Sequence, residues 1–168
     1  MPRSPKDRLG ATDPLARTYS TPMLRLNYTG GNITVVSGTT ESIPWTTPAI
    51  YDTHQLWDQG NPAAIDFSNA PTMAYWLTWS MEAGYDDTEI GTLWLDNDPA
   101  QIVDQTVGDR GGGSVIWAQT GFIYRIENGQ VLRLSVVNTA ANDTVIQGDA
   151  DDRLFLSVHG IPGTESRS

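Results

Sequence analysis

Cysteine, histidine and long apolar runs are absent or scarce in this 168-residue chain. The chain has no cysteine, which excludes disulfide bonds, a thiol nucleophile and thiolate metal ligands. Its two histidines, His54 and His159, lie far apart, so the His-x-His pair of a cupin-type metal site is missing. No apolar run approaches the roughly 18 residues of a membrane helix, and the N-terminus lacks the apolar segment of a secretory signal.

Basic residues are also few, and they are unevenly distributed. The net charge is −10, from 20 Asp and Glu against 10 Lys and Arg. Because affinity for nucleic acid and for anionic membranes comes mainly from basic side chains, we expect neither as a partner. The 84 residues from Leu26 to Asp109 carry twelve acids and no Lys or Arg. The acidity of the chain is therefore concentrated in its first two thirds, beyond residue 25.

The first 19 residues combine basic side chains with three prolines and little periodic apolar content. This composition is typical of a flexible arm or of an anchor that becomes ordered on a partner, and a frayed terminus has the same composition. As an anchor, the arm would bind an acidic groove on its partner through four side chains: Arg3, Lys6, Arg8 and Arg17.

Threonine occurs 19 times and tryptophan six times, a mixture that favours β-strands over helices. Apolar and polar residues alternate most clearly over 72–82, which places Tyr75 and Trp79 on one face and Trp76 on the other. We expect hairpins between the first two strands and at Asn128-Gly129, and long polar loops at 85–89 and 96–113. The other predicted strands are 23–28, 33–37, 92–96, 115–118, 122–126, 131–137 and 154–158.

Eight to ten short strands without intervening helices predict an all-β, antiparallel sandwich or barrel. The length is ordinary for one domain. We expect a flexible arm at 1–19, one β-sandwich domain at 20–162 and a flexible tail at 163–168.

Several segments follow a recognisable order. Residues 41–47 form a short extended segment that leads to Tyr51-Asp52, and Phe67 and Pro71 precede Tyr75 at the head of the long strand. The Asn128-Gly129 turn precedes the apolar run 131–134, and the last predicted strand is 154–158. Over about 20–161, this order resembles the tumour-necrosis-factor-like jelly-roll superfamily, which includes complement-type globular heads and is found in phage and viral structural proteins.

The resemblance implies an antiparallel jelly-roll sandwich that forms a homotrimer through aromatic-rich strand faces. The sequence is compatible with this, because a sandwich buries only one face of an outer strand and Trp76 needs a second covering surface. Either another subunit or a loop of its own chain covers it. The expected interface aromatics are Tyr75, Trp76, Trp94 and Phe155.

The residue patterns give little support for catalysis. There is no Gly-x-Ser-x-Gly elbow, and the glycines at 111–113 have neither the Lys nor the helix of a phosphate loop. A two-carboxylate glycosidase depends on the separation of the acids in space, which the sequence does not give. We expect a protein that is not an enzyme and has no cofactor.

Two weaker signals concern ligands. Loop carboxylates suit a hard cation such as Ca²⁺, although solvated turn acids form the same clusters; the candidates are Asp86, Asp87, Glu89, Asp96 and Asp98. Aromatic residues near polar loops either stack on sugar rings or belong to the core and interfaces; these are Trp45, Tyr51, Trp57 and Tyr85.

These observations favour a non-enzymatic virion structural protein of a bacteriophage or virus. We expect a capsid decoration protein (a cement or minor capsid protein) or a fibre head, present as a homotrimer on the particle surface. Its arm would bind the major capsid protein or another virion protein, and it would assemble in the host cytoplasm rather than be secreted by a signal peptide. The alternative is a trimeric head that binds a glycan or receptor, with or without Ca²⁺.

Overall fold

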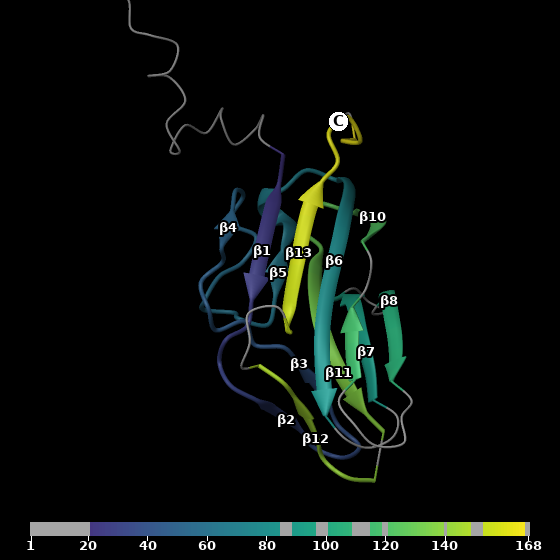
Figure 1. Cartoon of the computed structure of the whole chain (residues 1–168). Coiled ribbons are helices and arrows are strands. Elements are labelled where there is room, and N and C mark those ends of the chain that lie inside the picture. Colours follow the sequence, from purple (N-terminus) through teal and green to yellow (C-terminus); the bar gives the residue numbers. More distant parts are fainter. Residues whose placement is uncertain are drawn as a thin grey trace, which may run out of the picture.

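In the computed structural model, the chain forms two antiparallel sheets packed against each other (Figure 1). The structure describes residues 21–84, 89–96, 101–108, 115–118, 121–139, 141–148 and 153–166. The one helical segment in these ranges is a short 3-10 turn, η2 (Phe67–Asn69). The described residues contain no helix of the length and apolarity that a membrane span requires.

The larger sheet is built around the long strand β6. One edge of β6 pairs with β13 and, further along, with β12, and its other edge pairs with β10 and β9. Beyond β13 the sheet continues through β1 to β4, and beyond β12 it continues to β2. The strands of this sheet are β1 (Met23–Asn27), β2 (Ile33–Val35), β4 (Tyr51–Asp52), β6 (Met73–Gly84), β9 (Val115–Ala118), β10 (Phe122–Ile126), β12 (Thr144–Ile146) and β13 (Phe155–Gly160).

The smaller sheet has the order β3-β11-β7-β8, and β5 also pairs with β11. In the view of Figure 1, β11 passes behind β6, and β7 and β8 lie to the right of β6. The strands are β3 (Thr40–Ser42), β5 (Ile65–Asp66), β7 (Glu89–Leu95), β8 (Gln101–Gly108) and β11 (Val131–Asn138). The predicted all-β, antiparallel jelly-roll sandwich is confirmed.

Alternation along the strands determines the core. On β6 the predicted inward face is fully buried from Met73 to Met81, and Tyr75 and Trp79 are among its largest side chains. Leu93 on β7 and Leu134 on β11, which are register partners, are buried in the same core from the opposite sheet. The apolar face of each sheet is therefore covered by the other, as expected for a sandwich.

Both expected hairpins are wrong. β1 pairs with β13 and β4, whereas β2 pairs with β12. The turn at 127–130 connects β10 of the larger sheet with β11 of the smaller one. Gly129 adopts a positive φ of 84°, and the Asn128 side-chain amide donates hydrogen bonds to the carbonyls of Phe67, Ser68 and Ala70 at 2.8–3.2 Å. This tight turn therefore carries the chain from one sheet to the other.

The expected loop 96–113 contains a strand, β8, which pairs with β7 along its length. Its register with β7 shifts at Val103, since Leu93 lies opposite Asp104 whereas Trp94 lies opposite Ile102. At this point the Asp104 carboxylate accepts a hydrogen bond of 2.9 Å from the indole N–H of Trp79. An acid that contacts a core tryptophan breaks the period-2 pattern on which strand prediction depends.

The last described residues are attached to the larger sheet. Ser166 N donates to Thr72 O at 2.9 Å, and Thr164 Oγ accepts from Ala74 N at 3.0 Å. The guanidinium of Arg125 on β10 donates to Thr164 O and to the Ser166 hydroxyl. Residues 163–166 of the expected flexible tail are thus held against β6 and β10.

Candidate interaction surface

The outer face of the larger sheet carries a row of four cross-strand neighbours. These residues are Met23 on β1, His159 on β13, Trp76 on β6 and Ile123 on β10, and each is the register partner of the next. Residues opposite one another in adjacent strands share a face, and Trp76 stands on the side of β6 opposite the buried Tyr75. We call these four residues the outer row.

Trp76 and Ile123 are the exposed end of the outer row. The exposed fractions are 46% for Trp76 and 59% for Ile123. The indole of Trp76 lies across the backbone of Gly121, so that a Cβ atom placed at this glycine would be 2.0 Å from Trp76 Nε1. A glycine in this position therefore makes room for the ring to lie along the sheet surface.

His159 connects the outer row with the edge of the sheet. Its Nε2 lies 2.7 Å from the Tyr51 hydroxyl and 3.1 Å from the Ser157 hydroxyl. The Tyr51 and His159 rings meet edge to face, with centroids 5.8 Å apart. Such a pair fixes the imidazole beside Trp76.

The basic side chains near this face are already engaged within the chain. The guanidinium of Arg25 lies 3.7 Å above the Phe155 ring, and Arg153 forms an ion pair of 3.2 Å with the buried Glu82. Arg125 is bound to the C-terminal residues as described above. The exposed apolar surface at Trp76 and Ile123 therefore lies on a face whose described cations already have partners.

The four expected interface aromatics occupy three different environments. Trp76 and Phe155 share the outer face of the larger sheet. Trp94 is half-buried on the smaller sheet, where its indole N–H donates to Ser135 Oγ at 2.8 Å. Tyr75 lies in the core of its own chain with no exposed surface, because it belongs to the inward face of β6. The outer-row partners of Trp76 were missed, since cross-strand register leaves no local signal in the sequence.

The candidate ligand-stacking aromatics are also dispersed. Trp45 is fully buried, so the ring offers no face to a sugar, and its indole N–H has no hydrogen-bond partner among the described residues. Trp57 is half-buried and donates from Nε1 to Pro62 O at 3.1 Å. Tyr51 contacts His159 on the outer face. Tyr85 lies outside the described residues.

Most of the candidate metal ligands and the whole arm also lie outside the described residues: Asp86, Asp87, Asp98, Arg3, Lys6, Arg8 and Arg17. The backbone of Glu89 begins β7. Asp96 forms an ion pair of 3.1 Å with Arg133. No group of three or more His, Cys, Asp or Glu suited to a metal ion occurs in the part of the chain that the structure describes.

Solved structures with the same sheet arrangement identify the fold. The crystal structure of murine APRIL matches with a TM-score of 0.63 and 8% identity, over 84% of this chain and 100% of that one. Eiger TNF from S. frugiperda also gives 0.63, with 11% identity over 88% and 97% of the two chains. This is a tumour-necrosis-factor-like jelly roll.

The globular domain of zebrafish complement 1qA also has this fold, with a TM-score of 0.57 and 9% identity, over 88% of this chain and 100% of that one. No protein-family model matches the sequence, and no curated protein matches it either. The likeness between this chain and these solved structures therefore concerns the arrangement of strands rather than particular side chains. The resemblance inferred from the sequence is confirmed at the level of the fold.

Proposed function

We propose that this protein is a non-enzymatic, self-associating head that forms a homotrimer through the outer face of its larger sheet. The observation that carries the proposal is the exposed pair Trp76 and Ile123 on that face. Burial of a large apolar side chain stabilises an interface by about 1.5–3 kcal/mol. The hydrophobic effect therefore favours association through this pair. The resemblance to the jelly-roll superfamily implies that three copies associate.

The pair alone is too small for a stable interface, which buries about 800 Å² on each partner. The rest of the outer row and the Tyr51 ring supply further surface beside it. Aromatic residues surrounded by polar groups are typical of interface centres. The interface would thus extend from Ile123 across β6 and β13.

The location of the trimer is the surface of a bacteriophage or virus particle, where it decorates the capsid or forms a fibre head. The polarised charge of the chain supports this: residues 1–19 hold four of the ten basic residues, whereas 26–109 hold none. An acidic body is suited to the solvent-facing side of a particle, and a basic arm to an acidic groove on a capsid protein. The trimer would assemble in the host cytoplasm.

Changes in the arm test this division of roles. We expect that deletion of residues 1–19 abolishes co-sedimentation with particles that lack this protein, while the trimer mass is unchanged. Replacement of Arg3, Lys6, Arg8 and Arg17 by Gln keeps the chain length and is expected to have the same effect. If charge is responsible, particle binding by the wild type strengthens at low salt, and binding by this variant does not. Undiminished particle binding, or loss of the trimer, would refute the proposed roles.

A further inference from the structure

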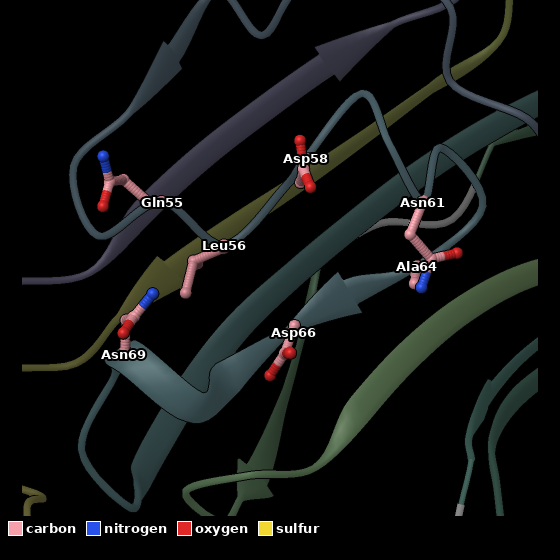
Figure 2. Close-up of a pocket in the computed structure, with 7 residues that line it drawn as sticks. All are labelled: Gln55, Leu56, Asp58, Asn61, Ala64, Asp66 and Asn69. Carbon is pink, nitrogen blue, oxygen red and sulfur yellow. The ribbon is translucent and has the colours of Figure 1, made fainter.

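A polar pocket of about 330 Å³ lies on the loop that joins β4 to η2 (Figure 2). Its volume is at the lower end of the range for small-molecule sites. It does not include the outer-row residues or the tryptophans expected to stack on sugars. The residues that line it are Gln55, Leu56, Asp58, Asn61, Ala64, Asp66 and Asn69.

The lining combines hydrogen-bond donors and acceptors above two buried apolar residues. In Figure 2, Gln55 and Asn69 lie on the left beside Leu56, Asp58 and Asp66 lie to its upper and lower right, and Asn61 lies further right beside Ala64. Leu56 and Ala64 are buried, whereas the amides and carboxylates are exposed. Amide groups both donate and accept, and carboxylates accept. A ligand that fits must also donate and accept at several points, which is typical of a polyhydroxylated molecule such as a sugar.

The carboxylates have unused acceptor capacity. Asp58 Oδ1 accepts from Gly60 N at 3.1 Å, and Asp66 Oδ1 accepts from the backbone and hydroxyl of Ser68 at 2.8 and 2.6 Å. Within the described ranges, Oδ2 of each acid has no hydrogen bond. The lining contains no Lys or Arg, so neither acid is neutralised there. Ligand hydroxyls can donate to both oxygens.

The pocket walls are fixed by hydrogen bonds that involve the backbone of the lining residues and their neighbours. The Asp52 carboxylate accepts from the backbone N–H of Leu56 and of Trp57, both at 2.9 Å. Asp66 N donates to Leu56 O at 2.7 Å, and the Trp57 indole donates to Pro62 O. A ligand therefore does not have to order this loop, which lowers the entropic cost of binding.

We propose that this pocket binds a neutral sugar, either a hexose or an N-acetylhexosamine. The two carboxylates repel acidic sugars. The proposal does not depend on the trimer or on the arm, since the pocket is built within one chain. The pocket is separate from the loop aromatics expected from the sequence, and it is built from acids and amides.

Saturation-transfer difference NMR on the full chain tests the proposal, with galactose, glucose, mannose, N-acetylglucosamine and N-acetylgalactosamine as probes and sialic acid as the acidic comparison. We expect binding of at least one neutral sugar and none of sialic acid. Asn61→Ala and Asn69→Ala should each weaken binding about fivefold, the effect of one lost hydrogen bond. The side-chain amides of Asn61 and Asn69 make no hydrogen bonds in the described chain, so both variants should fold normally.

Gln59→Ala is the matched control, because Gln59 is an exposed residue of the same loop that does not line the pocket. Its sugar binding should equal that of the wild type, and the same holds for Trp76→Glu, which separates this site from the trimer interface. Three outcomes would overturn the proposal. The first is that no neutral sugar binds, and the second is that Asn61→Ala and Asn69→Ala bind sugar as tightly as the wild type. The third is that the protein binds calcium but no sugar, and that Asn61→Ala abolishes the calcium binding.

Discussion

Tyr75 and Trp76 are adjacent in sequence and lie on opposite faces of β6. Tyr75 is buried in the core, where its hydroxyl donates to Pro71 O at 2.9 Å and its ring meets Phe67 edge to face at 5.0 Å. Trp76 is nearly half exposed. The side-chain period of two in a strand explains this difference, so at the residue scale one aromatic holds the fold together and its neighbour is available for assembly.

The buried Tyr75 hydroxyl predicts a loss of stability at alkaline pH. Burial, reinforced by the negative charge of Glu165, raises the pKa of Tyr75 well above its usual value near 10. The contribution is fully present below about pH 10 and is lost at higher pH, because only the unfolded chain then ionises at this residue. Urea unfolding at pH 9 and pH 11 measures it.

The matched variant for this prediction is Tyr75→Phe, which cannot ionise. We expect it to lose about 1 kcal/mol less stability than the wild type between the two pH values. Equal losses in the two proteins would mean that Tyr75 ionises as readily in the fold as in the unfolded chain. At neutral pH the variant should be about 1 kcal/mol less stable, since the Pro71 carbonyl loses its partner.

At the scale of elements, the sequence shows which residues form a strand more clearly than which strands pair. β9 and β10 have their predicted bounds, and both faces of β6 are as predicted. The hairpins were wrong because pairing is decided by which apolar faces the whole sandwich covers: Leu24 and Leu26 lie opposite Val158 and Leu156, which are 134 and 130 positions away. Local alternation carries no signal for such a distant partner.

Two glycines offer a prediction on how the elements tolerate an added methyl group. A Cβ at Gly148 would lie 2.1 Å from the backbone oxygen of Gly31, and one at Gly121 would lie 2.0 Å from Trp76 Nε1. Backbone cannot give way easily, whereas an exposed indole can rotate. We expect Gly148→Ala to cost about 1–3 kcal/mol in urea unfolding and Gly121→Ala less than half of that.

Gly121→Ala has a second expected effect, because it turns the Trp76 indole away from the sheet. The variant should dissociate at higher protein concentrations than the wild type in sedimentation-velocity runs. Gly148→Ala, which lies on the β12 side of the sheet, serves as the control and should retain its assembly wherever it is folded. A Gly121→Ala protein that assembles normally would show that the position of the indole is unimportant.

At the scale of the whole molecule, the fold could be predicted and the sites largely could not. The composition and the order of segments led to the jelly roll that the neighbours share. Of the outer row of the proposed interaction surface, the sequence pointed to Trp76 alone, since the other three residues come from three other strands. The sugar pocket was missed because a hydrogen-bonded loop, rather than a motif, brings its acids and amides together.

The solution mass of the protein, measured by light scattering after size exclusion, tests the central claim of self-association most directly. We predict that the wild type has three times the chain mass of 18.4 kDa. Trp76→Glu should reduce it to one chain mass, because an unpaired charge would be buried at the interface. Val36→Glu, at a 50% exposed apolar residue beyond β2, is the control and should remain a trimer. A monomeric wild type, or a trimer unaffected by Trp76→Glu, would contradict the account.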